Sequence, residues 1–182
     1  ADAGVTMQDF IETAVQASAL TRNVQRPDLL LMGALLHDIG KARGGDHSVV
    51  GAAIASGLAE RMGFDADDCA VIVALVRHHL LLGDTATRRD LEDPAVIGEV
   101  ATLLGDVSTL ELLHELTIAD ALATGPTVST DWRFGLIGDL VEDLRGESGQ
   151  SGHPPVQRLR EVQFSAHGGL GDGGHLGLAT NG

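Results

Sequence analysis

Imidazole and carboxylate side chains interrupt three apolar stretches of the sequence. The residues concerned are His37, Asp38, His47, His78, His79 and Asp120. Both types of side chain bind divalent metals, and each is costly to bury without a partner. Helices that carry such residues at their ends or centres can build a metal site inside a helical bundle. We therefore predict that these residues converge on a metal ion.

The adjacent pair His37 and Asp38 has a second interpretation when it is taken alone. A hydrogen-bonded histidine followed by an aspartate that caps the next helix would give the same dipeptide. Neighbouring residues point about 100 degrees apart on a helix, but both can reach one ion that lies beyond the last turn. The three other places in the sequence, at His47, at His78-His79 and at Asp120, favour the metal site.

The composition indicates one all-α domain. The chain has 182 residues, of which 43% are hydrophobic, and no Tyr; this gives a sizeable core with helix-forming rather than strand-forming residues. The net charge of −14 argues against nucleic acid and against an anionic membrane surface as partners. The single cysteine, Cys69, excludes an intramolecular disulfide and a Cys-based zinc cluster. We expect no apolar run to reach the roughly 18 residues of a membrane span, and therefore a cytoplasmic protein.

Apolar spacing, capping residues and Gly or Pro breaks predict about seven helices and no strand. The expected ranges are about 5–21, 28–41, 48–62, 65–79, 94–105, 109–124 and 130–144. The polar segment 85–90 is expected to be a break between helices. After residue 145 the chain is rich in Gly and Ser and cannot bury enough apolar surface to offset ordering. We therefore expect a domain over 1–145 and a flexible tail over 146–182.

The order of the motifs resembles a known family. The chain resembles the HD superfamily of metal-dependent phosphohydrolases, because an HD pair is followed in order by H, HH and D. The common form of the signature of this superfamily is LLHDIGK. Four longer blocks resemble the HD domain of the GlnD enzymes, which attach nucleotides to the PII signalling protein and remove them. These blocks are HDIGKARGGDHSVVGA, LVRHHLLL, TATRRDLEDPAVI and TIADALATG, and the resemblance covers about residues 5–145. In that family the HD domain is the nucleotidyl-removing phosphodiesterase.

The resemblance implies a divalent metal ion, Mn, Mg, Fe or Zn, and a set of ligands for it. His37 and Asp38 match the paired ligands, and Asp120 matches the distal aspartate. The additional histidines, which would line the centre or hold a second ion, are matched by His47, His78 and His79.

Three basic residues match positions that would meet the substrate. Lys41 matches the lysine of HDIGK, which would stabilise charge on the phosphate; a cation at a helix C-terminus is the structural alternative. Arg88 and Arg89 match the RRD block and could guide a phosphate or an acidic partner. Pairing with Asp90 or Glu92 is the alternative for one of the two arginines.

The sequence departs from the family at the first helix. HD domains begin with another His ligand there, whereas VTMQDFIET contains none, and Asp9 is the nearest substitute. The expected function is metal-dependent removal of UMP or AMP from a PII-type protein. Two alternatives stay open: hydrolysis of a free nucleotide, and a degenerate module that keeps the fold without catalysis.

Overall fold

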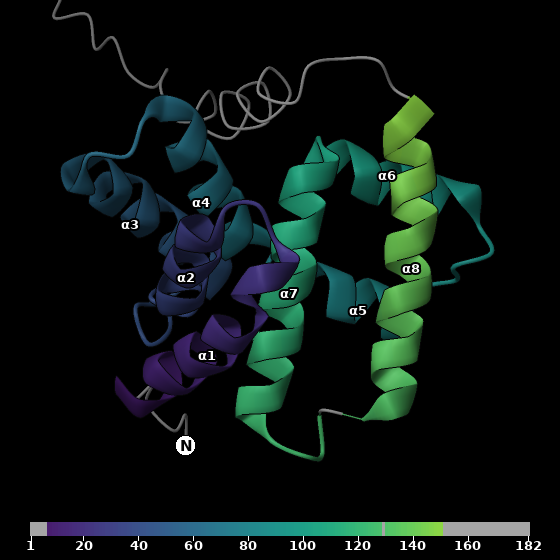
Figure 1. The fold of residues 1–182 in the computed structure, drawn as a ribbon, viewed down its shortest axis with the longest axis horizontal. Helices are drawn as coiled ribbons and strands as arrows, with labels where there is room; N and C mark the ends of the chain where they lie inside the picture. Colours follow the sequence, from purple (N-terminus) through teal and green to yellow (C-terminus); the bar gives the residue numbers. More distant parts are fainter. Residues whose placement is uncertain (1–6, 129, 151–182) are drawn as a thin grey trace, which may run out of the picture.

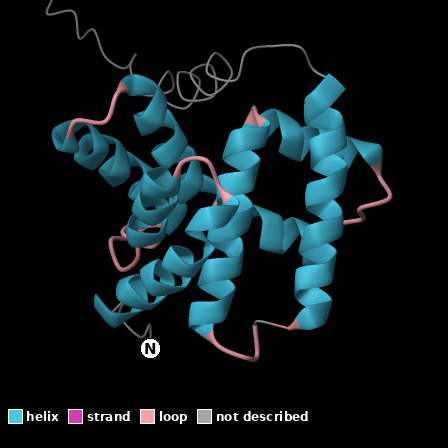
Figure 2. Ribbon diagram, in the orientation of Figure 1, coloured by secondary structure: helices cyan, strands magenta, loops and turns pink. Residues whose placement is uncertain are grey.

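The computed structural model describes residues 7–128 and 130–150, except for the side chains of Asp9 and of residues 147–150. These residues form eight α-helices and one short 3-10 helix, and no strand occurs among them (Figure 2). The helices are α1 (Met7–Leu20), η1 (Thr21–Asn23), α2 (Pro27–Leu36), α3 (His47–Met62), α4 (Ala66–His78), α5 (Leu81–Arg88), α6 (Pro94–Leu104), α7 (Val107–Thr124) and α8 (Asp131–Gln150). The all-α class is confirmed.

Helix α7 joins two groups of helices (Figure 1). It packs on α1, α2 and α4 on one side and on α5, α6 and α8 on the other. Leucines of α7 such as Leu113 and Leu116 are fully buried, as are Leu30 of α2 and Leu75 of α4. Because α2, α4 and α7 share this core, their polar residues are held in fixed relative positions.

Asp46 and Gly63 delimit α3. The Asp46 carboxylate accepts hydrogen bonds from the backbone N–H groups of Ser48 and Val49, as an N-cap residue does. Gly63 ends the helix with φ of 90°, a conformation that glycine adopts without strain. This cap fixes where α3 begins, and therefore where His47 lies.

Helix α2 is shorter than expected, and α5 was not expected. Helix α2 ends at Leu36, and a series of tight turns follows it up to residue 45. The segment 85–90 was expected to break the helix, but α5 continues to Arg88. Its buried residues include Leu82, Thr85 and Ala86, which have i, i+3 and i+4 spacing. Packing of that face against α8 outweighs the low helix propensity of Gly83 and its polar neighbours.

Helix α8 crosses the expected domain boundary. It runs to Gln150 rather than ending near residue 145. The rest of the expected flexible tail, 151–182, lies outside the described residues. The boundary at 145 therefore stays a prediction.

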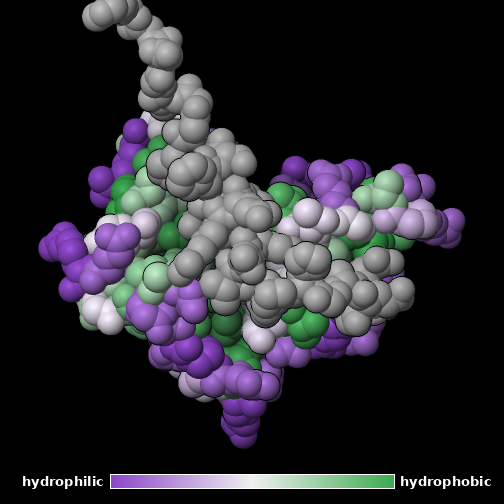
Figure 3. Space-filling view, turned by 90° about the horizontal axis from the view of Figure 1, so that it is seen from above, coloured by the Kyte–Doolittle hydropathy of each residue, from purple (hydrophilic) through white to green (hydrophobic). Residues whose placement is uncertain are grey.

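One stretch of the described chain is long and apolar enough to cross a membrane, contrary to the expectation from the sequence. It is Ala66–Arg88, which covers α4 and α5, and 61% of its apolar window is buried inside the protein. Such burial is typical of core helices. On the face drawn in Figure 3, hydrophilic residues gather at the outer edges and hydrophobic residues are visible between them.

An arginine clamp connects the starts of α2 and α4. Arg26 donates hydrogen bonds to both carboxylate oxygens of Asp68, at 2.6 and 2.7 Å, and to both of Asp28, at 3.0 and 2.7 Å. The hydrogen bonds from Arg26 hold the pKa of Asp28 below its ordinary value. The clamp therefore ties two core helices together at the surface.

Replacing Arg26 with Ala is expected to lower the unfolding free energy by about 1 kcal/mol and Tm by about 2–4 °C, as for a partly exposed bidentate pair. Because folding lowers the pKa of Asp28, the stabilisation is present above the unfolded pKa of about 3.9 and is lost as the pH falls through the folded pKa. Thermal unfolding at pH 7 and pH 3 measures both effects. Arg22→Ala, at an exposed arginine of η1, is the control, and an equal loss in both variants would contradict the clamp.

Candidate metal centre

The site lies where α2 ends. His37 and Asp38 directly follow α2 and are 1% and 5% exposed. The backbone N–H of Ile39 donates to Leu36 and that of Lys41 donates to Asp38, so the chain turns tightly here. This tight turn aims both side chains of the His-Asp pair at one point beyond the helix.

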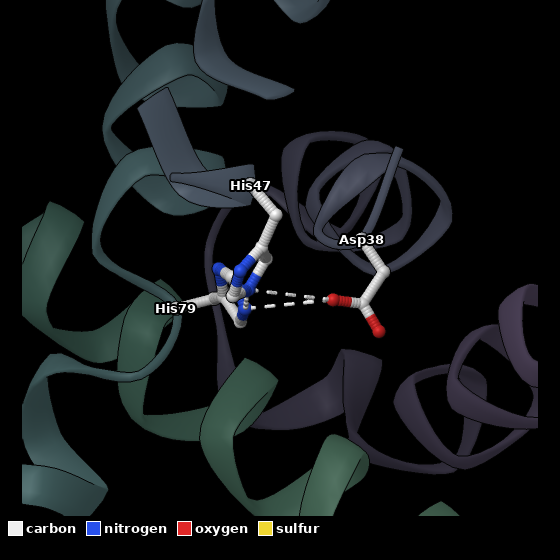
Figure 4. A group of neighbouring side chains, drawn as sticks. All are labelled: Asp38, His47 and His79. Atoms are coloured by element: carbon white, nitrogen blue, oxygen red, sulfur yellow. Dashed lines mark hydrogen bonds and ion pairs between the residues drawn. The ribbon is translucent and has the colours of Figure 1, made fainter. Parts of the chain in front are cut away.

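The Asp38 carboxylate is the hub of the site (Figure 4). Its Oδ1 lies 3.6 Å from Nε2 of His79 and 3.9 Å from Nε2 of His47, and the two imidazole nitrogens are 3.4 Å apart. Its Oδ2 lies 3.2 Å from Nε2 of His37, which is 3.4 Å from Asp120 Oδ1. The structure thus brings together five of the six residues that the sequence singled out as metal ligands.

Backbone carbonyls set the orientation of two of the imidazoles. Nδ1 of His37 lies 2.8 Å from the carbonyl oxygen of Ala34, and Nδ1 of His79 lies 2.8 Å from that of Val76. When Nδ1–H donates to the carbonyl, Nε2 presents its lone pair to the centre. Fixing the tautomer in this way is typical of metal-ligating histidines.

A cation would satisfy an atom that the protein leaves unpaired. Asp38 Oδ1 is buried and accepts no hydrogen bond from any described residue. An orphaned carboxylate oxygen is expensive to bury. Ligand atoms of Asp38, His47 and His79 all lie within 4.8 Å of one another, so one ion could reach all three. Imidazole nitrogen with carboxylate oxygen suits Zn, Fe or Mn, so these residues fit a divalent metal.

The charge states of Asp38 and His79 also suit a metal. Burial opposes ionisation of Asp38, but hydrogen bonding to His37 and Lys41 lowers its pKa below the usual range. Burial lowers the pKa of His79, which keeps that imidazole neutral at pH 7. Burial also disfavours the charged form of His37, yet hydrogen bonds to Asp120 and Asp38 outweigh it and raise its pKa to about 9. His37 must therefore release a proton to become a ligand.

His78 lies apart from the centre. It is the last residue of α4, so its side chain points about 100 degrees away from that of His79. It is not among the residues that line the pocket beside the candidate ligands. Burial and the charge of Arg77 lower its pKa to about 4, which fits a partly buried neutral imidazole.

Arg88 and Arg89 also lie apart from the centre. Neither of them lines the pocket that opens over the candidate ligands. Arg88 is 3.3 Å from Asp84, one turn away on α5, and Arg89 is 2.8 Å from Glu99 of α6. The expected partners, Asp90 and Glu92, are not the ones used. Lys41, by contrast, contacts Asp38 Oδ2 and lines the pocket.

A pocket of about 550 Å³ opens over the five candidate ligands. It also includes side chains that the sequence reasoning missed: Glu12, Thr13, Leu80, Ala123 and Thr124. None of them carries an unusual sequence signal, because Glu and Thr are common on helix surfaces. The family's first-helix histidine, which this chain lacks, would belong to α1, the helix that contributes Glu12 and Thr13 to the pocket. The ring of Phe10 on α1 lies edge-on to His37, with centroids 6.5 Å apart, whereas the side chain of Asp9, the proposed substitute, lies outside the described residues.

Comparison with known proteins gives matches over the same region. A sequence model of the HD domain matches residues 8–125. The chain is 61% identical over 137 residues to the bifunctional uridylyltransferase/uridylyl-removing enzyme of Streptomyces coelicolor, covering 75% of the chain and 16% of that enzyme. Identity to the enzyme of the same name is 54% over 136 residues in Mycobacterium tuberculosis (74% of the chain, 17% of the enzyme). It is 40% over 153 residues in Ectopseudomonas mendocina (82% of the chain, 17% of the enzyme). The chain spans about a sixth of the length of these relatives.

Proposed function

The chain belongs to the HD-domain family, and on this premise we propose that it is a metal-dependent phosphodiesterase that removes UMP or AMP from a PII-type signalling protein. The names of its relatives support uridylyl removal as the reaction. A cytoplasmic location and a PII-type partner belong to the same proposal. Because the chain spans a small part of these relatives, the proposal concerns this domain alone.

One observation carries the proposal. Residues from four parts of the chain converge at the Asp38 carboxylate. His47 at the start of α3 and His79 after α4 face its unpaired Oδ1, while His37 after α2 faces its Oδ2 and is faced in turn by Asp120 of α7. They do so on one side of an open pocket. A binding module needs no such convergence of ligating atoms, whereas a metal-dependent hydrolase does.

The ligands would be His37, Asp38, His47, His79 and Asp120. A divalent ion held there supplies Lewis acidity and lowers the pKa of a bound water from about 15.7 towards about 7. The protein's own contribution is to fix the ligands by backbone hydrogen bonds and to hold Asp38 in its charged form. Both features reduce the reorganisation that the reaction requires.

Lys41 would stabilise the phosphate. Its Nζ contacts Asp38 Oδ2, and its side chain is 45% exposed, so it can turn into the pocket. In the proposed hydrolysis, the oxygen of water forms a bond to phosphorus, and the bond between phosphorus and the tyrosine oxygen of the modified protein breaks. One proton of the water remains on the nucleotide product or passes to solvent, and the other ends on tyrosine. The Lys41 cation offsets the negative charge that develops on the phosphoryl oxygens.

The experiment that tests this proposal is nucleotide release from a uridylylated or adenylylated PII protein. The purified chain loaded with Mn²⁺, Fe²⁺ or Zn²⁺ is expected to release UMP or AMP, and EDTA is expected to abolish release until metal is restored. Chromatography of the nucleotide and metal analysis of the protein provide the measurements.

Two outcomes would favour the alternatives. Faster hydrolysis of free nucleotides than of modified PII would indicate another branch of HD phosphohydrolases. Absence of release and of bound metal would indicate a non-catalytic module, which the presence of Phe10, rather than an imidazole, beside His37 would then explain.

A further inference from the structure

The wall of the pocket formed by α1 carries a carboxylate that the metal centre does not use. Glu12 lines this wall together with Thr13. Gln8, one turn earlier on α1, donates a hydrogen bond from Nε2 to Glu12 Oε1 at 2.7 Å. That bond occupies one oxygen and leaves the other, and the remaining lone pairs, available to a ligand.

The two sides of the pocket differ in chemistry. Helix α1 packs on α2 and α7, while α4 packs on α3, α2 and α7, so the pocket has an α1 wall and an α3–α4 wall. Leu80, directly after His79, is 43% exposed and presents an apolar surface on the second wall. The α1 wall therefore offers a charged hydrogen-bond acceptor, and the other wall offers a hydrophobic contact.

Among the pocket-lining side chains outside the metal centre, Glu12 is the main hydrogen-bond acceptor that a ligand could use at the α1 wall. Thr13 is 2% exposed, which leaves little of it for a ligand. The hydroxyl of Thr124 already donates to the carbonyl oxygen of Asp120 at 2.9 Å. An ionised carboxylate only accepts hydrogen bonds, so it repels a phosphate and attracts hydroxyl or N–H donors.

We propose that Glu12 recognises the ribose of the nucleotidyl group by accepting hydrogen bonds from its 2′- and 3′-hydroxyls. The proposal rests on the proposed function, which places a nucleoside phosphate in this pocket. A vicinal diol offers two donors to one carboxylate, and the phosphate is drawn instead to Lys41 and the metal-ligand residues. The leaving group then lies towards Leu80, so the pocket sets the direction in which the diester binds.

The test compares the p-nitrophenyl ester of uridine 5′-phosphate with its 2′,3′-dideoxy analogue, using the full chain loaded with divalent metal. The unsubstituted protein is expected to favour the ribose ester about 10-fold in kcat/KM, mainly through KM, as for a charged hydrogen bond at a partly solvated site. Glu12→Gln is expected to reduce this ratio to about 3-fold, because neutral hydrogen bonds are about half as strong. Glu12→Ala is expected to bring it to about 1. Glu92→Gln, the same charge change at an exposed residue outside the pocket, is expected to keep the 10-fold ratio.

A ratio that survives in Glu12→Ala would overturn the proposal, as would the absence of any preference in the unsubstituted protein. A fall in kcat for both esters with an unchanged ratio would also overturn it, since Glu12 would then act on the reaction and not on the ribose. If no ester is hydrolysed, binding of UMP against 2′,3′-dideoxy-UMP by equilibrium dialysis tests Glu12 by itself with the same expected ratios, and nucleotide release from modified PII tests the proposed function separately.

Discussion

Replacing Asp38 with Asn is expected to abolish metal-dependent hydrolysis and to remove bound metal from the purified protein. Asn has the same shape but no charge, and its amide cannot act as the anionic hub that faces His47 and His79. Losing even an outer-shell partner of a metal ligand costs about 10–100-fold, so the loss of this ligand should exceed about 100-fold in metal affinity and in kcat/KM. The loss of activity should therefore be nearly complete.

The measurements are metal content, nucleotide release from modified PII, and circular dichroism. The fold is expected to survive, because the substitution removes a buried charge with an unpaired oxygen and leaves the partly exposed Lys41 free to reach water. Asp84→Asn is the matched control, since Asp84 is 45% exposed on α5 and pairs with Arg88 away from the pocket. Normal metal content and activity in Asp38→Asn would contradict the assignment of the centre.

The residues at the heart of the site could be predicted because polar groups are rare in apolar helices. Asp120 in mid-helix and His37 at the end of an apolar run needed partners, and the structure supplies each to the other at 3.4 Å. Choosing between His78 and His79 was not possible from the sequence. The two are adjacent, and only the packing of α4 on α2 and α7 decides which imidazole faces inward.

Other features depend on tertiary contacts that leave no local pattern. The two adjacent arginines match a block that would meet the substrate, and their partners in the structure, Asp84 for Arg88 and Glu99 for Arg89, depend on the course of α5 and on the position of α6. Glu12 is an ordinary residue of an exposed helix face and becomes notable only because α1 packs beside the pocket. The sequence thus pointed to five residues that the structure brings together, whereas the walls around them had to come from the structure.

Replacing Gly40 with Ala is expected to destabilise the protein strongly, although it adds only one methyl group. A Cβ at this position would lie 2.0 Å from the carbonyl oxygen of His47 and 2.5 Å from the backbone nitrogen of Gly51. Both atoms belong to the backbone of α3 and cannot rotate away as the end of a side chain could. The turn after α2 and the first turns of α3 must therefore separate. We expect a loss of roughly 3 kcal/mol or more in unfolding free energy.

The same separation should disrupt the metal centre. Gly40 is two residues after Asp38, and the contact it makes with the backbone of His47 sets how far that imidazole lies from the carboxylate, 3.9 Å at present. Metal affinity is therefore expected to fall together with stability. Urea unfolding with and without metal measures both, since metal bound only to the native state adds stability that Gly40→Ala should no longer gain.

Gly57→Ala provides the matched control for Gly40→Ala. Gly57 lies within α3 on its exposed side, and apart from its chain neighbours and the adjacent backbone of its own helix no described atom lies within 4 Å of a Cβ added there. The same substitution should therefore stabilise by about 0.5–1 kcal/mol, because Ala loses less conformational entropy than Gly in a helix. A lower unfolding free energy in Gly40→Ala together with a higher one in Gly57→Ala would show that the close approach of the turn to α3 causes the loss. Helix propensity would not explain it. A neutral Gly40→Ala variant with intact metal binding would mean that the turn can move without disturbing the ligands, and the rigid positioning of His47 by its contact with Gly40 would have to be abandoned.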